Sequence, residues 1–282
     1  MSTEAEEHAA PGARQEEQAS PPGRLAGART FFRRYAMAML FVIGLLAIWE
    51  LAVRIGHVPE YLLPAPSQVA VDLKTDWVIL GPATWVTLRE VLIGFIIAAS
   101  AGIGIAVVLH LSTPLRRALY PVLIASQTIP IIVLAPILVI LFGYGILPKL
   151  IIVALICFFP IVVNGLDGLR SVDEDFIEMM KTLDANRWAT FRRVEFPAAL
   201  PSIFSGMRIA ATFASIGAVF GEWSGSNAGL GYVMLAATPN LLTARIFAAI
   251  FILTVVALAL FGLVSLVERL AVPWAPRGGS ID

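Results

Sequence analysis

The stretch LIIVALICFFPIVVNGL, residues 150–166, decides the fold class, because it is almost long enough to cross a bilayer and carries no charged side chain. A transmembrane helix needs roughly 20 mostly apolar residues to cross about 30 Å of hydrocarbon. Runs of this kind lie at residues 37–55, 84–110, 118–142, 148–169, 201–222 and 246–270. The sequence therefore predicts an all-α integral membrane protein with six transmembrane helices.

Composition supports a lipid environment. Of the 282 residues, 58% are hydrophobic and 14% are charged, where a soluble domain has roughly 25% charged residues. The net charge of zero offers no basic excess for a nucleic acid, which we exclude as a partner. The single cysteine, Cys157, has no second thiol for an internal disulfide or a thiolate metal site.

The chain divides into three predicted parts. Residues 1–30 are rich in Glu and Pro and are predicted to form a disordered cytoplasmic tail. Residues 31–275 form the membrane domain, and residues 276–282 are a C-terminal tail.

The basic residues predict the orientation of the helices, since Lys and Arg near helix ends prefer the cytoplasmic side. The segments before the first run, after the second, after the fourth and after the sixth hold most of the basic residues. Both termini are therefore predicted to be cytoplasmic, in the same compartment as the loop at about residues 170–200.

Prolines and glycines mark special positions within the predicted helices. Pro130 and Pro136 in the third run and Pro160 in the fourth each remove a backbone donor that lipid cannot replace. Such breaks are expected inside a helix bundle or beside a water-filled path. Small residues in the second run, among them Gly94, Gly102 and Gly104, predict close helix packing.

The loop at residues 170–200 is too polar to span a membrane and too long for a simple turn. Acidic residues precede a helical apolar pattern, and a second pattern follows a break at residues 184–186. Two short amphipathic helices that meet at a turn are predicted. The alternative is a loop that lies on the membrane surface, with Trp188 and Arg192 at the lipid headgroups.

This loop resembles the cytoplasmic signature of the membrane permeases of binding-protein-dependent ATP-binding cassette importers. That signature reads Glu-Ala-Ala, three residues, Gly, nine residues, then Ile-x-Leu-Pro. The matching positions here are Glu178, Met179, Met180, Asp184, Val194, Phe196 and Pro197. The spacing is intact, but methionines replace the alanines and Asp184 replaces the glycine, whose positive φ Asp adopts less readily.

Further stretches extend the resemblance over most of the chain. They are LPAPSQV at 63–69, TLREVLIGF at 87–95, FGYG at 142–145 and GEWSGSNAGLGYVM at 221–234. The chain is most similar to the branch for nitrate, sulfonate and taurine-type substrates. The last stretch is closest to relatives for thiamine-pyrimidine precursors or riboflavin. The resemblance favours a vitamin or pyrimidine precursor as the solute.

The resemblance also implies partners. It predicts a permease homodimer in the cell membrane of a prokaryote, with cytoplasmic ATP-binding subunits that use ATP and Mg, and an extracytoplasmic solute-binding protein. No cofactor is expected in this chain, which has no G-x-x-x-x-G-K-[ST] loop. The expected contacts with the ATPase are the signature residues given above together with Leu183 and Trp188.

Polar groups at membrane depth are the candidate solute contacts. They are Gln127, Thr128, Asn164, Glu222 and Trp223. Each has a structural alternative. Glu222 could bind backbone amides of the loop at residues 225–231, Trp223 could anchor the helix at the interface, and Arg208 could form a structural ion pair.

Two other classes of protein compete with the importer. In an ion-coupled secondary transporter or channel, Glu90, Glu222 or Asp167 would relay ions. An intramembrane enzyme would need a nucleophile with a base, or a metal-ligand cluster, and the three histidines, His8, His57 and His110, lie far apart in the sequence. No catalytic or metal-binding residue is predicted.

Overall fold

The computed structural model describes residues 24–274. The described residues divide into two compact units, and the boundary lies between Leu51 and Ala52. Helix α1 (Arg24–Ile55) begins within the range predicted as a tail, and it contains the predicted span at residues 37–55. The remainder of the N-terminal tail and the whole C-terminal tail lie outside the described residues.

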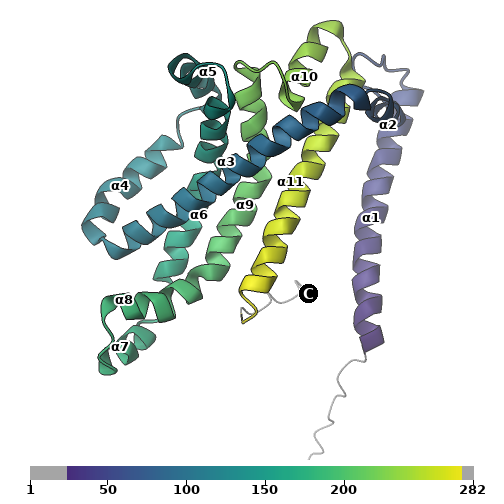
Figure 1. Ribbon diagram of the computed structural model, residues 1–282. Helices are drawn as coiled ribbons and strands as arrows, with labels where there is room; N and C mark the ends of the chain where they lie inside the picture. Colours follow the sequence, from purple (N-terminus) through teal and green to yellow (C-terminus); the bar gives the residue numbers. More distant parts are fainter. Residues whose placement is uncertain (1–23, 275–282) are drawn as a thin grey trace, which may run out of the picture. The chain divides into compact units, whose positions relative to one another are not determined.

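The larger unit is built from helices (Figure 1). In chain order they are α2 (Pro66–Thr75), α3 (Trp77–Leu111), α4 (Thr113–Ser126), α5 (Ile131–Phe142), α6 (Ile146–Arg170), α7 (Glu174–Thr182), α8 (Arg187–Thr190), α9 (Phe196–Trp223), α10 (Leu230–Ala237) and α11 (Thr243–Ala271). A π-helical turn, Phe191–Glu195, joins α8 to α9, and a 3-10 turn, Thr238–Asn240, follows α10.

Most of the predicted apolar runs coincide with candidate spans. Among the described residues, four helical stretches, α3, α6, α8 to α9 and α11, are long and apolar enough to cross a membrane. The run at residues 37–55 lies within α1, which is not one of these four. The pair α4 and α5 passes the same test together and gives a fifth, although the two helices are bent by 98°. The all-α membrane fold is confirmed. The third predicted span, residues 118–142, is a broken pair of helices rather than one continuous helix.

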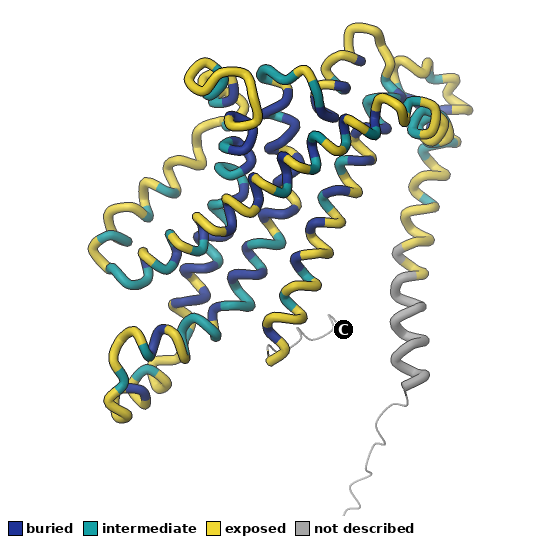
Figure 2. Tube along the Cα trace, viewed as in Figure 1, coloured by how far each residue is buried: buried dark blue, intermediate teal, exposed yellow. Residues whose placement is uncertain are grey.

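Helices α3, α6 and α9 pack closely because glycines let their backbones approach. A Cβ atom on Gly94 of α3 would lie 2.6 Å from Val153 of α6, and one on Gly206 of α9 would lie 2.6 Å from the carbonyl oxygen of Pro160. Buried residues accordingly follow α6 and α9 in Figure 2. Packing by Gly94 and Gly102 is confirmed, whereas Gly104 has no neighbour within 4 Å and faces open space.

Candidate functional site

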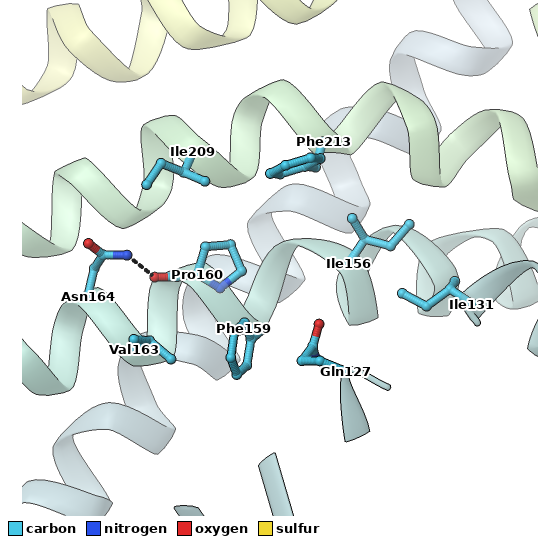
Figure 3. A pocket seen from close by; sticks show the side chains of 9 residues that line it. All are labelled: Gln127, Ile131, Ile156, Phe159, Pro160, Val163, Asn164, Ile209 and Phe213. Carbon is cyan, nitrogen blue, oxygen red and sulfur yellow. Dashed lines mark hydrogen bonds between the residues drawn. The ribbon is translucent and has the colours of Figure 1, made fainter. Parts of the chain in front are cut away.

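A cleft of about 420 Å³ lies beside the break between α4 and α5. Its walls come from the break itself and from α5, α6 and α9 (Figure 3). The lining residues are Gln127, Ile131, Ile156, Phe159, Pro160, Val163, Asn164, Ile209 and Phe213. All nine are uncharged, and only Gln127 and Asn164 bring polar side chains. The cleft thus unites two of the five predicted solute contacts.

The break positions Gln127 at the cleft. Helix α4 ends at Ser126, and Pro130 caps the start of α5. The hydroxyl of Thr128 donates to the Ala125 carbonyl oxygen at 2.8 Å, and the same oxygen accepts from the Thr128 amide at 3.1 Å. Thr128 is exposed and is not among the cleft-lining residues, so its contact with a solute stays a prediction.

Asn164 is held in place by the interrupted part of α6. Its Nδ2 donates to the Pro160 carbonyl oxygen at 2.8 Å, as the dashed line in Figure 3 shows. Phe159 and Phe213 add aromatic side chains from α6 and α9. The arrangement is an apolar, aromatic cleft with two carboxamides, which suits a small neutral solute that carries hydrogen-bonding edges.

The structure corrects the role predicted for Glu222. Its side chain is fully buried, Thr87 Oγ1 donates to its Oε1 at 2.6 Å, and the Gly231 amide donates to its Oε2. These bonds match the structural alternative for Glu222, in which its carboxylate binds backbone amides of the loop at residues 225–231. A buried carboxylate that accepts these hydrogen bonds has no surface with which to contact a solute. The indole of Trp223 donates to the Gly231 carbonyl oxygen at 3.0 Å, which ties the ring to the same loop.

A buried ion pair was missed by the sequence reasoning. Lys149 lies in the first turn of α6 and donates to Glu90 Oε1 at 2.7 Å. It also donates to the hydroxyl of Ser226 at 2.7 Å. The signal available in the sequence was a Lys at the start of one apolar run and a Glu inside another. The predicted structural role of Arg208 is confirmed by its ion pair with Glu268.

The loop between α6 and α9 folds as predicted, as a short helix, a turn and a second helical segment. The Asp173 carboxylate accepts from the Asp175 amide at the start of α7, and Asn186 Oδ1 accepts from the Ala189 amide at 2.8 Å at the start of α8. Both are N-cap bonds. Asp184, at the position of the signature glycine, has a φ of 53°. It therefore adopts the left-handed backbone that a glycine would adopt there.

The two helices expose some predicted contact residues and bury one. Met179, Leu183 and Trp188 are about half exposed or more, and Glu178 is exposed as well. Met180 is only 7% exposed. Its predicted contact with a partner subunit is thus replaced by packing within this chain. Of the later signature residues, Val194, Phe196 and Pro197 are half-buried along the junction with α9.

This loop is fastened to the end of α3. The Arg187 guanidinium donates to the Leu111 carbonyl oxygen at 3.4 Å, and His110 Nε2 contacts Glu195 Oε2 at 2.9 Å. Phe191 is buried and stacks against Trp188 with ring centroids 5.3 Å apart. The π-helical turn at this junction is a rare element that occurs often at functional sites. A displacement of the loop would therefore act on α3 and α9 together.

No metal site is evident in the part of the chain that the structure describes. Among residues 24–274, no group of three or more His, Cys, Asp or Glu side chains is arranged to hold an ion. Cys157 is fully buried, and its Sγ lies 3.4 Å from the Ala210 carbonyl oxygen.

Comparison with known proteins gives consistent results. The formylaminopyrimidine transport permease protein ThiX of Halalkalibacterium halodurans is 39% identical over 242 residues, which cover 84% of this chain and 95% of that protein. The riboflavin transport system permease protein RibX of Chloroflexus aurantiacus is 37% identical over 235 residues, covering 82% and 87%. Both lie in the group of relatives that the sequence motifs indicated.

A solved structure shows the same fold. The MetNI methionine ABC transporter in an inward-facing conformation matches with a TM-score of 0.59 at 17% identity, over 67% of this chain and 94% of the solved chain. Residues 91–272 match the family described as the inner membrane component of binding-protein-dependent transport systems. This stretch includes the broken span, the cleft and the loop between α6 and α9. The chain therefore belongs to the family of binding-protein-dependent transport system inner membrane components.

Proposed function

We propose that this chain forms the translocation path of an ATP-driven importer for a small, neutral, heteroaromatic solute, a vitamin or pyrimidine precursor. The uncharged cleft lined by Phe159, Phe213 and the two carboxamides carries this proposal. A flat ring gains both apolar burial and favourable ring contacts between aromatic side chains. The similarity to ThiX and RibX, whose names state heteroaromatic solutes, supports the same class.

The charges around the cleft make sulfonate, taurine and nitrate less suitable solutes. An anion at membrane depth needs a cation or several hydrogen-bond donors to replace its hydration. Two cations on the lining helices, Lys149 of α6 and Arg208 of α9, are already paired with Glu90 and Glu268. A neutral solute needs no such partner.

The energy source in this proposal is a pair of cytoplasmic ATP-binding subunits that use ATP and Mg. They would bind the exposed face of α7 and α8, which presents Glu178, Met179, Leu183 and Trp188. Apolar residues in the centre of such a surface and charges at its rim are typical of an interface. Because Arg187 and Glu195 join this loop to α3, movement of the ATPases would pass into the bundle as a rigid-body displacement.

The oligomeric state, the orientation and the outer partner in this proposal are taken from the family to which the chain belongs. Two copies of the permease would form the path in the cell membrane of a prokaryote, with both termini cytoplasmic and a solute-binding protein on the outer side. The ion-coupled alternative requires accessible carboxyl groups. Glu90 and Glu222 are buried and hydrogen-bonded instead. Asp167, in the last turn of α6, is exposed and is the one accessible carboxyl group of the three considered for that alternative.

Uptake by variants of the cleft tests the proposed solute class. We expect the complex, reconstituted in proteoliposomes with its ATP-binding subunits and binding protein, to take up labelled formylaminopyrimidine or riboflavin but not taurine. Phe213→Ala should raise the KM by about tenfold, since one aromatic contact and its apolar burial are lost. Ile140→Ala is the matched control, because Ile140 is 82% exposed on α5 and does not line the cleft.

Two results would contradict the proposal. The first is uptake of taurine, a sulfonate or nitrate in preference to the heteroaromatic solutes. The second is an unchanged KM for the heteroaromatic solute in the Phe213→Ala variant, which would place the path elsewhere in the bundle.

A further inference from the structure

A buried set of polar contacts connects α3 and α6 with the segment that links α9 to α10. The first arm runs from Glu90 through Lys149 to Ser226, with both Lys149 contacts at 2.7 Å. The hydroxyl of Ser226 in turn donates to the Ala228 carbonyl oxygen at 2.6 Å. This arm joins a residue of α3, a residue of α6 and the segment 224–231.

A second arm reaches the same segment from α3 and α9. Thr87 Oγ1 accepts from the Leu230 amide at 2.8 Å and donates to Glu222 Oε1 at 2.6 Å. Glu222 Oε2 accepts from the Gly231 amide. Thr87 and Glu222 are fully buried, so these bonds are protected from competition with water.

Backbone packing reinforces the two arms. A Cβ atom on Gly221 would lie 3.0 Å from Lys149 Cα, and one on Gly231 would lie 3.0 Å from the Val219 carbonyl oxygen. Gly229 has a φ of 110°, a conformation that L side chains rarely adopt. The segment is therefore built to lie tightly against the three helices at this one place.

The same helices carry the loop proposed to bind the ATPases. Helix α6 begins beside Lys149 and ends at Arg170, directly before that loop, and the helical stretch from Arg187 to Trp223 follows it. Figure 1 shows α7 and α8 at one end of the bundle and α10 at the other. The polar contacts thus lie at the far ends of the helices that the loop would move.

We propose that Thr87, Glu90, Lys149 and Glu222 are positioning residues that form a two-armed clamp. The clamp makes the segment 224–231 move with α3, α6 and α9 when the ATPases displace the loop at residues 171–195, which contains α7 and α8. The clamp rests on the proposed function, because it assigns the outer end of the same path. Without it, the helices would still move, but the outer segment would no longer follow them.

Hydrogen exchange tests the clamp contacts directly. Thr87→Val keeps the shape of the side chain and removes the hydroxyl bonds to Leu230 and Glu222. We expect exchange of the Leu230 amide to accelerate by about tenfold or more, since that amide loses its acceptor, Thr87 Oγ1. Thr254→Val is the matched control, because Thr254 is exposed on α11 and donates only to the Ile250 carbonyl of its own helix. Unchanged exchange in Thr87→Val would overturn the proposal.

A label on the segment tests the movement. Asn227 is exposed and Cys157 is buried, so Asn227→Cys gives a single reactive thiol. In the otherwise unchanged complex, we expect the rate of maleimide labelling to differ by about threefold or more between the ATP-free and the ATP-vanadate-trapped states. Adding Thr87→Val should abolish this difference while ATP hydrolysis continues, and adding Thr254→Val should not. As a further check, Glu222→Gln should keep the response, since an amide can still accept from Gly231 and donate to Thr87.

The outcomes separate the clamp from the solute. If the labelling rate of Asn227→Cys responds to trapping equally in the Thr87→Val and Thr254→Val backgrounds, the contacts serve local packing alone. If the labelling rate does not respond even without either substitution, the segment does not move. Either result overturns the proposal. A wrong solute class would leave the labelling response intact, because the label reports movement and not uptake.

Discussion

Replacing Gly206 by alanine should weaken the interface between α6 and α9, although the same change usually favours a helix. A Cβ atom at this position would lie 2.6 Å from the Pro160 carbonyl oxygen and 2.9 Å from Asn164 Cβ. The first contact is with backbone, which no rotamer change can move. To restore ordinary contact distances, the two helices must separate by roughly 1 Å.

The magnitude follows from two opposing effects. Alanine gains up to about 1 kcal/mol of helix propensity over glycine, while overpacking of a well-packed interior costs about 1–3 kcal/mol. The interface of α6 with α9 is the most extensive between two helices in the described part of the chain. The cost of overpacking should therefore exceed the gain in helix propensity and lower the Tm by on the order of 5 °C.

Gly104→Ala provides the comparison, since Gly104 also lies within a helix but has no neighbour within 4 Å. Both variants would be purified in the same detergent and melted at one scan rate, with tryptophan fluorescence as the probe. We expect a clear loss for Gly206→Ala and no loss for Gly104→Ala. Equal shifts for the two variants would refute the inferred backbone contact between α6 and α9.

Other changes give further tests. Asp184→Val should destabilise the loop by about 1–2 kcal/mol, because a β-branched residue fits a φ of 53° poorly. Asp184→Gly should change the free energy of unfolding by less than about 0.5 kcal/mol, and thermal melts of the two variants test the difference. Burial and the neighbouring carboxylates of Asp76 and Glu60 raise the pKa of Asp72. The ionised form of Asp72 therefore lowers the stability of the fold as the pH rises above its ordinary range. Asp72→Asn should accordingly raise the Tm more at about pH 7 than at about pH 4. Leu183→Asp should abolish ATPase binding in a pull-down yet shift stability by less than about 0.5 kcal/mol, since Leu183 is 68% exposed; loss of the fold instead would place Leu183 in the core.

Most of the helical architecture could be predicted from the sequence, because apolar length alone identifies a span. The third run was the exception. Its apolar residues extend across the break at residues 127–130, so hydropathy could not show that two helices meet there at 98°. Pro130 gave the local signal for the break, but the angle depends on how α4 and α5 pack against the other helices.

The candidate site was predictable in part. Gln127 and Asn164 could be selected as polar groups beside proline breaks, and both line the cleft. Phe159 and Phe213 could not be distinguished from other apolar residues, because only the helix rotation shows which faces meet. The pairing of Glu90 with Lys149 joins residues far apart in the sequence, and a lone Lys at a helix start is equally typical of a surface loop.

The spacing of the loop signature proved more informative than its residue types. Asp184 adopts the backbone that a glycine would supply, so the substitution does not alter the turn. The exposure of Met179 and the burial of Met180, in contrast, follow from the phase of α7 against the rest of the loop. The position of the turn could thus be predicted from the spacing of the signature. The face that a short helix presents to a partner could not be predicted in this way.

The energy source of uptake tests the central claim most directly. Proteoliposomes that contain this permease, its ATP-binding subunits and its binding protein would be assayed for uptake of formylaminopyrimidine and riboflavin with ATP maintained, while ionophores collapse all ion gradients. The account predicts that uptake continues under these conditions and stops when ATP is withdrawn. Uptake that disappears with the ion gradients while ATP remains would contradict it and would assign the transport to ion coupling.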